Sequence, residues 1–412
     1  MKKSIVLISI ILFHTHSKSP AYIEKEMINS RFYTINYENL LKNKRMVYLS
    51  QIASDVKYIP LETNPSCLIN QHQSVKFFLT DRWIFVQNVN HVLKFSVDGR
   101  FINKIGRPGR GPGEIGIINS MSVIPDKEMI VIYDFRKLFF FSFNGDLIKT
   151  INIPFHQEVI ILKDSRYLTY DPGTNGSEKY NFILANERGD TISVVKNYTT
   201  WKKTLPGSIL VTNSANEATF YINDKIPYFK SKYNDTVYYF NKEKDIIEPA
   251  YLIDLGKYKV PEELIPEKIA TDPIKFQDFQ KRAINYFLVK PLEISNQVFI
   301  RSSCMWRRDI KYLMYDKDSK TGCSLVNENG ESTGILNDWD GGVDFWPNMQ
   351  NYNNQVIMPL DIFQFKEKIG LQNHSGRKIK YPNEQKSLMD LISRLDNLDN
   401  PIIMKVTLKS KF

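Results

Sequence analysis

A β-hairpin motif recurs along this chain at a nearly constant spacing. The first copy, over residues 92–105, has alternating apolar residues on either side of an Asp-Gly turn. The second copy, over 139–151, has an Asn-Gly turn, and its Gly145 lies 46 residues after Gly99. A weaker third copy turns at Gly189, 44 residues later. Alternation around such dipeptides indicates hairpins. Their repetition at about 45 residues is typical of a β-propeller with one four-stranded blade per repeat.

The repeat predicts an all-β fold in which a single propeller occupies residues 46–370. Apolar strands precede each hairpin, so that five units can be traced after residue 77, and a partial unit follows at 355–364. A propeller often completes its last blade with strands from both ends of the chain, because this removes an open sheet edge. We therefore expect residues 48–62 to pair with 355–364. The result is a six-bladed β-propeller with an N-terminal strand closing the ring.

Two segments depart from the strand pattern. Residues 261–287 have helical spacing, early acidic residues and little β-branching, which predicts a helical insertion between blades. After residue 370 the chain becomes polar, and we expect a C-terminal extension over 371–412. Within it, 384–395 has the pattern of an amphipathic helix and 402–408 that of a closing strand.

The N-terminus has the pattern of an export signal. Lys2 and Lys3 precede an apolar core over residues 5–13 that is too short to span a bilayer. We expect a signal peptide over 1–19 and a polar lead-in segment over 20–45. No Cys follows the apolar core, so we expect no lipobox anchor, and no later segment is long enough to be transmembrane. The sequence thus predicts an exported protein, periplasmic or associated with the cell envelope.

The chain is basic, but its charges are dispersed. The formal net charge is +10, from 55 Lys and Arg against 45 Asp and Glu. No helix or aromatic motif organises the basic residues, so they indicate a solvated surface and not a nucleic-acid-binding site.

The three cysteines give no metal or disulfide pattern. Cys67, Cys304 and Cys323 are widely spaced, and their number is odd. We expect three small, partly buried side chains. The alternative is a disulfide between Cys304 and Cys323.

Four motifs in a fixed order carry a family resemblance. They are Ile-Pro-Leu-Glu-Thr at 59–63, the Gly- and Pro-rich run at 106–114, Asn-Asp-Thr-Val-Tyr at 234–238, and the run from Asp-Gly-Gly to Phe-Trp-Pro at 340–347. Together they resemble the six-bladed β-propeller family of Gram-negative envelope proteins, which is distantly similar to NHL-repeat propellers. The resemblance covers residues 45–370. It implies a six-bladed fold and an exported protein, and it carries no established reaction. Many members look like lipoproteins, whereas this chain lacks the lipobox cysteine.

The Gly- and Pro-rich loop at 106–114 is the first candidate ligand-binding surface. Its glycines allow close approach to the backbone, and Arg107, Arg110 and Glu114 would supply charge around it. The loop is not a P-loop, because it has no Gly-Lys-Ser/Thr and no helix clearly follows. The structural alternative is a blade connector whose Arg and Glu side chains pair with each other.

A second candidate lies at Asp338–Trp346. It contains three carboxylates and two aromatic platforms: Asp338, Asp340, Asp344, Trp339 and Trp346. Carboxylates beside aromatic platforms can suit carbohydrate, and two of the carboxylates could act as acid and base. The same carboxylates could coordinate Ca²⁺ with backbone oxygens. No other cofactor or metal site is expected. The structural alternative is a Gly-Gly turn flanked by solvated acids and core tryptophans.

Histidine is scarce, and no catalytic spacing can be drawn. No Ser-His-Asp or His-metal pattern is present among the six His. We therefore predict a binding or scaffold module for a glycan, a peptide or an envelope protein partner. The alternative is a lyase or hydrolase acting on carbohydrate or peptide at the central channel. Such an enzyme would bring carboxylates, histidines or a metal together at the channel mouth.

Overall fold

The computed structural model describes residues 32–70, 75–162, 165–171, 178–200, 218–269, 272–305, 309–348, 354–372 and 377–409. The expected signal peptide over 1–19 and the start of the expected lead-in segment lie outside the described residues.

Most of the described strands form small sheets in which they pair in sequence order. Sheet 1 contains β4 (Lys76–Leu79), β5 (Trp83–Gln87), β6 (Val92–Ser96) and β7 (Phe101–Ile105). Sheet 2 contains β10 (Ser120–Ile124), β11 (Met129–Tyr133), β12 (Lys137–Ser142) and β13 (Leu147–Asn152). Sheet 3 contains β14 (Glu158–Ile161), β15 (Tyr167–Tyr170), β16 (Tyr180–Ala185) and β17 (Thr191–Lys196).

The later sheets add strands from the N-terminal part of the chain. Sheet 4 contains β18 (Thr219–Asn223), β19 (Ile226–Lys230), β20 (Thr236–Asn241), β21 (Ile246–Asp254) and β1 (Tyr33–Asn36). Sheet 5 contains β22 (Phe287–Ile294), β23 (Gln297–Cys304), β24 (Ile310–Asp316), β25 (Thr321–Leu325) and β2 (Lys44–Arg45). Sheet 6 contains β26 (Gln355–Leu360), β27 (Ile402–Leu408) and β3 (Ala53–Pro60).

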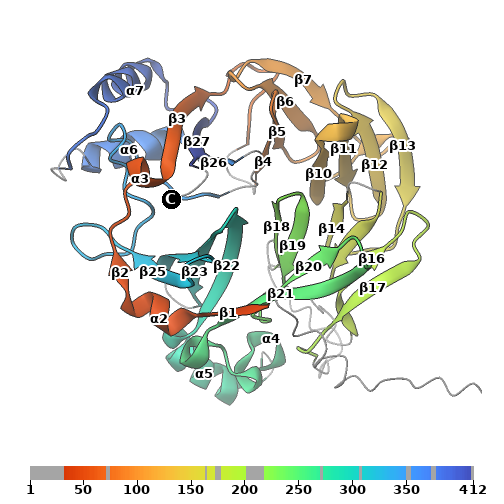
Figure 1. The fold of residues 1–412 in the computed structure, drawn as a ribbon. Helices are drawn as coiled ribbons and strands as arrows, with labels where there is room; N and C mark the ends of the chain where they lie inside the picture. Colours follow the sequence, from red (N-terminus) through yellow and green to blue (C-terminus); the bar gives the residue numbers. More distant parts are fainter. Residues whose placement is uncertain are drawn as a thin grey trace, which may run out of the picture.

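The sheets are arranged around a common centre in a β-propeller-like fold (Figure 1). The first strand of each of sheets 1 to 5, from β4 to β22, lies nearest that centre. Apolar side chains fill the spaces between neighbouring sheets. Phe85 and Val92 of sheet 1, for example, belong to one buried cluster with Ile130 and Phe139 of sheet 2. Each sheet therefore depends on its neighbours to cover its faces.

The predicted hairpins are confirmed. β6 pairs with β7, β12 with β13 and β16 with β17, all antiparallel. The turn residues Gly99, Gly145 and Gly189 have φ of 91°, 98° and 91°. Residues with a Cβ rarely adopt this conformation, which explains the repeated glycine.

Gly99 also brings the first hairpin into contact with sheet 6. Its carbonyl oxygen accepts a 2.8 Å hydrogen bond from the amide of Glu62. A Cβ at Gly99 would lie 2.1 Å from the carbonyl oxygen of Pro60, the last residue of β3. At Gly330, which has φ of 77°, a Cβ would meet nothing within 4 Å.

We expect Gly99→Ala to destabilise the protein more than Gly330→Ala. Both changes impose a positive φ on alanine, at a cost of about 1–2 kcal/mol. Only Gly99→Ala also forces a side chain against the backbone of β3, which adds roughly 1–3 kcal/mol. Urea unfolding of both variants measures the difference. Equal losses would mean that the contact with Pro60 is easily relieved.

The lead-in segment is more structured than its polar sequence indicates. β1 pairs in parallel with β21, and β2 pairs in parallel with β25. Between them, α2 (Tyr37–Lys42) buries Tyr37 and Leu40. The described part of the lead-in is therefore an outer edge of sheets 4 and 5.

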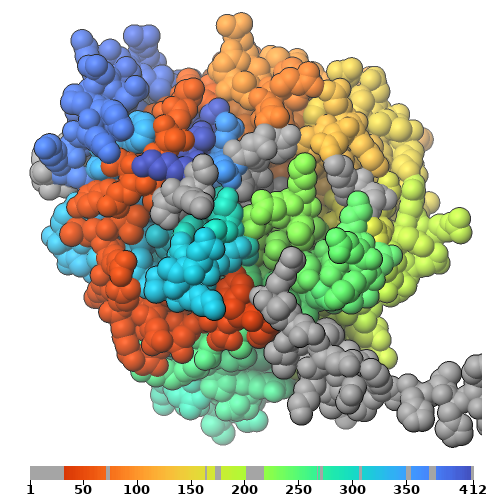
Figure 2. Space-filling view, in the orientation of Figure 1, coloured from red at the N-terminus to blue at the C-terminus, as the bar shows by residue number. Residues whose placement is uncertain are grey.

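Sheet 6 joins an N-terminal strand to C-terminal strands, but not by the expected pairing. Residues 402–408 form β27, which lies between β26 and β3 and pairs with both. The expected direct pairing of 48–62 with 355–364 is therefore wrong, although both lie in one sheet. The segment 371–412 does contain a helix and a strand, as expected, but the strand is central to sheet 6. Figure 2 shows these C-terminal residues, in blue, packed against N-terminal residues in red and orange.

The remaining helices cover the rim. The predicted insertion between sheets 4 and 5 contains η3 (Glu262–Leu264), α4 (Pro266–Ile269), α5 (Pro273–Arg282) and η4 (Ala283–Asn285). The other helical segments are α3 (Leu49–Ile52), η1 (Pro125–Lys127), η2 (Gly256–Tyr258), α6 (Ile362–Gln372) and α7 (Pro382–Arg394). Cys67, Cys304 and Cys323 are buried and free, so the alternative disulfide is not formed.

Candidate functional site

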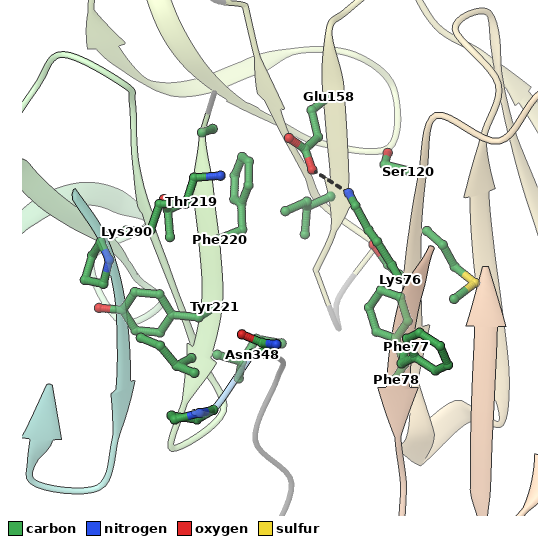
Figure 3. A pocket seen from close by; sticks show the side chains of 18 of the residues that line it. Lys76, Phe77, Phe78, Ser120, Glu158, Thr219, Phe220, Tyr221, Lys290 and Asn348 are labelled. Atoms are coloured by element: carbon green, nitrogen blue, oxygen red, sulfur yellow. Dashed lines mark hydrogen bonds and ion pairs between the residues drawn. The ribbon is translucent and has the colours of Figure 1, made fainter. Parts of the chain in front are cut away.

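A cavity lies among the innermost strands of the described fold. Its volume is about 350 Å³, and its walls come from β4, β10, β14, β18, β22, β23 and the segment 346–348. We call it the central channel. Figure 3 shows Lys76, Phe77, Phe78 and Ser120 on one side and Thr219, Phe220, Tyr221 and Lys290 on the other. The first strands of five sheets therefore contribute side chains to one site.

The channel contains more positive than negative charge. Its charged lining residues are Lys76, Glu158, Lys290 and Arg301. Lys76 and Glu158 form an ion pair with a 3.1 Å separation, drawn as a dashed line in Figure 3. Lys290 and Arg301 are direct partners on β22 and β23. Neither makes an ion pair within the part of the chain that the structure describes.

The side chain of Lys290 faces the cavity, so it is accessible to solvent there although the channel walls lie close to it. The surrounding protein lowers the pKa of Lys290 by desolvation, and the nearby Arg301 lowers it further. The negative charge of Glu158 raises the pKa of Lys290, whereas the positive charge of Lys76 lowers it. The four charged groups are thus close enough to influence one another.

Aromatic and uncharged polar side chains complete the lining. Phe78 and Phe220 are half-buried, and Asn348 is exposed toward the cavity. The hydroxyl of Tyr221 forms a 2.8 Å hydrogen bond with the hydroxyl of Tyr251, and this bond fixes the orientation of the Tyr221 ring. Aromatic faces beside a few polar groups are the usual composition of a small-molecule site.

A buried carboxylate supports the channel wall formed by β18 and β22. Glu293 on β22 is 2% exposed and forms an ion pair with Lys317. The side-chain amide of Asn223, at the end of β18, donates to the same carboxylate at 2.7 Å. Burial raises the pKa of Glu293, although Lys317 and Asn223 oppose this shift. Glu293 does not line the channel, so we assign it a structural role.

The predicted loop at 106–114 is built around Glu114. β8 (Arg107–Pro108) pairs in parallel with β9 (Glu114–Ile115). The carboxylate of Glu114 accepts a 2.8 Å hydrogen bond from the amide of Gly111. A Cβ at Gly109 would lie 2.0 Å from the same carboxylate. Arg107 and Arg110 are exposed and, within the described ranges, neither guanidinium forms an ion pair with Glu114. Glu114 therefore orders the loop and leaves the two arginines facing solvent.

The segment Asp338–Trp346 is mostly buried. Asp340 is 2% exposed and accepts hydrogen bonds from the side chains of Tyr58 and Asn337 and from the amide of Gly342. Its burial raises the pKa of the Asp340 carboxyl. Trp339 packs against Tyr381 with the two rings tilted, at 4.3 Å between ring centroids.

Trp346 connects this segment to the channel. It packs on Tyr312 at 4.7 Å between ring centroids, is 7% exposed and lines the cavity. Trp339 and Trp346 belong to the same buried cluster. Of the six candidate ligand-binding residues from the sequence, Trp346 alone is among the described residues that line the channel. The structure does not bring Arg107, Arg110 or Glu114 into this cavity.

Sequence reasoning missed Lys76, Lys290 and Arg301. The available signal was a charge within an apolar strand, as in Phe-Leu-Val-Lys-Pro-Leu-Glu-Ile at 287–294. Such a residue must face water, a partner or a cavity.

The described residues do not group catalytic side chains in the channel. Glu158 is the one carboxylate in the lining, and no His lines it. The His156 ring lies 2.7 Å from the carboxylate of Asp171, which also accepts a hydrogen bond from the amide of Gln157. Because His156 and Gln157 lie between β13 and β14, we assign these contacts a structural role in the connection between sheets 2 and 3. No group of three or more His, Cys, Asp or Glu side chains in the described ranges is placed to hold a metal ion.

Comparison with known proteins identifies relatives of the fold. A putative exported protein from Bacteroides fragilis has a similar structure, with a TM-score of 0.66 and 18% identity over 91% of this chain and 99% of that chain. A member of the DUF4221 family from Bacteroides vulgatus has a TM-score of 0.45 and 10% identity, over 87% and 97% of the two chains. A search of the curated proteins finds no match.

Within the described residues, no helix has both the length and the apolar character needed to cross a membrane. The family model described as "Domain of unknown function (DUF4934)" matches residues 32–407, nearly the whole of the described fold. The chain therefore belongs to the DUF4934 family.

Proposed function

We propose that this chain is an exported binding module that holds a small ligand in its central channel. The observation that carries the proposal is the channel lining, which is built from five sheets and combines half-buried aromatic faces with polar and charged side chains. A cavity of about 350 Å³ is within the range of small-molecule sites. A glycan, a short peptide or a side chain of an envelope protein partner is the ligand class that we expect.

The proposal includes a six-bladed propeller with sheet 6 as its closing blade. Sheets 1 to 6 would each be one blade, and the pairing of β3 with β27 supports closure by strands from both parts of the chain. Closure would fix the relative positions of the channel side chains. A site on rigid strands needs less ordering when a ligand binds.

Export is proposed from the N-terminal pattern of Lys2, Lys3 and the apolar core at 5–13. The similar fold of an exported-type Bacteroides protein is consistent with it. A periplasmic or envelope location would place the channel among glycans and envelope proteins.

The lining supports binding better than catalysis. Hydrolysis of a glycan needs two carboxyl groups in most families. Glu158 already pairs with Lys76, and the described lining holds no second carboxylate. A lyase or hydrolase acting in this channel would have to use other groups.

The exposed arginines of the 106–114 loop form a second candidate surface. Arg107 and Arg110 face solvent beside a backbone that Glu114 holds in place. An acidic partner could contact both guanidinium groups without any change in the loop.

A glycan and peptide array, with and without calcium, tests these proposals on three proteins. We expect wild type to bind at least one member. Asn348→Trp should fill the channel and weaken binding at least tenfold, whereas Arg107→Ala with Arg110→Ala should leave channel binding unchanged. The double variant should lose only about 0–1 kcal/mol of stability, because both side chains are exposed.

The outcomes separate the two surfaces. Loss of binding in the double arginine variant alone would reject the channel and support the loop. Absence of binding by wild type to every glycan and peptide would reject both ligand classes. Binding only with calcium would show that the ligand is held together with an ion.

A further inference from the structure

We propose that the central channel recognises an oxyanion, a carboxylate or phosphate group of a small ligand, between Lys290 and Arg301. This inference rests on the proposed channel function and specifies its ligand. The starting observation is the strand register. Lys290 on β22 and Arg301 on β23 are directly opposite each other, and both line the cavity.

Two like charges in this position are unfavourable by themselves. Directly opposed residues on antiparallel strands have Cβ atoms about 5 Å apart, and like charges there destabilise the sheet. Within the described ranges, neither cation has a carboxylate partner. The repulsion between these two cations would be relieved by an anion from outside the chain, so their arrangement favours an anion-binding site.

The other charges in the channel do not supply that anion. Glu158 is the nearest candidate, and its carboxylate is paired with Lys76 at 3.1 Å. Glu293 is on the same strand as Lys290 but is buried and paired with Lys317. The lining therefore holds three cations and one carboxylate.

The chemistry of the two cations indicates which group they would bind. The planar guanidinium of Arg301 can donate two parallel hydrogen bonds to one carboxylate or phosphate group. The ammonium of Lys290 adds a compact charge that adapts to the position of the anion. Glu158 would repel a second negative group, so a ligand with a single oxyanion is favoured.

The rest of the lining defines the body of the ligand. Phe78 and Phe220 are half-buried, and Thr219 and Asn348 offer uncharged polar groups. Together they suit a small polar ring with one acidic substituent. An acidic monosaccharide satisfies both requirements, and inorganic phosphate provides the oxyanion without the ring.

The closing experiment puts a carboxylate side chain where the proposed anion would bind. Lys290→Glu would place a carboxylate opposite Arg301 and convert the like-charge pair into an ion pair. We expect the Tm to rise by roughly 1–3 °C. The same variant should bind galacturonic acid at least tenfold more weakly than wild type in calorimetry. Lys127→Glu, which makes the same charge change at an exposed residue outside the channel, is the matched control.

The probes distinguish the sources of the oxyanion. Wild type is titrated with galacturonic acid, galactose and inorganic phosphate. Binding of galacturonic acid over galactose supports a carboxylate site, and binding of phosphate alone supports a phosphate site. If neither anion binds, or if Lys290→Glu lowers the Tm while Lys127→Glu does not, the inference is rejected. If galactose and galacturonic acid bind equally and Asn348→Trp abolishes both, the channel function stands and the anion inference fails.

Discussion

A chain that ends after Asn400 is expected to lose its cooperative unfolding transition. This truncation removes β27, the middle strand of sheet 6, and leaves β26 and β3 without their common partner. Five apolar side chains of β27 are buried: Ile402, Ile403, Met404, Val406 and Leu408. At about 1.5–3 kcal/mol each, their loss amounts to about 10 kcal/mol. This is comparable with the whole stability of a typical domain.

Thermal unfolding followed by circular dichroism measures the effect, and a chain that ends after Lys409 is the control. The control retains β27 and the hydrogen bonds of the Lys409 side chain to the carbonyl groups of Ser50 and Gln51. We expect it to unfold like the full chain. A sharp transition near the wild-type Tm in the shorter truncation would show that sheet 6 is dispensable.

Lys317→Met is expected to destabilise the protein by about 3–5 kcal/mol at pH 7. The change leaves the carboxylate of Glu293, which is 2% exposed, without its cationic partner. Adding Glu293→Gln should restore much of the loss, because the amide is neutral and can still accept from Asn223. Lys42→Met removes an exposed pair with Glu38 and should cost only about 0.3–0.5 kcal/mol. Guanidinium unfolding of wild type and the three variants measures these differences.

The loss caused by Lys317→Met should also depend on pH. Burial raises the pKa of Glu293 in the folded protein above its ordinary value of 4.5. The folded state then binds more protons than the unfolded state, so stability falls as pH rises from about 4.5 through the folded pKa. Removing Lys317 raises that pKa further and widens the window. The difference between wild type and Lys317→Met should therefore be small near pH 4 and grow toward neutral pH. A difference independent of pH would contradict this account.

The repeated hairpins could be predicted from sequence because their signal is local. Asp-Gly and Asn-Gly turns at Gly99 and Gly145 need a positive φ, and alternation on both sides fixes the strands. The position of β27 could not be predicted in the same way. Its pairing with β3 is decided by tertiary contact, and a polar segment separates it from β26. β1 and β2 are short and lie in polar sequence, so no alternation of apolar residues could predict that they pair in parallel with β21 and β25.

The candidate site was harder to predict than the fold. Trp339 and Trp346 stand beside carboxylates in sequence, and only the structure distinguishes a sugar platform from a core side chain. The channel gathers residues from β4 to β23, which lie far apart in the chain, so no spacing relates Lys76 to Lys290. What the sequence did contain was Lys290 inside an apolar strand. A charge at such a position indicates a cavity but does not locate it.

The pairing of β3 with β27 also constrains how this chain folds. The hydroxyl of Ser54 donates to the carbonyl oxygen of Thr407, a contact that spans 353 residues. Sheets 1 to 3 consist of neighbouring segments and can form early, whereas sheet 6 must wait for nearly the whole chain. Until β27 arrives, β3 presents an unpaired edge to other chains. We therefore expect sheet 6 to form last, and delayed arrival of the C-terminal segment would favour aggregation over the native state.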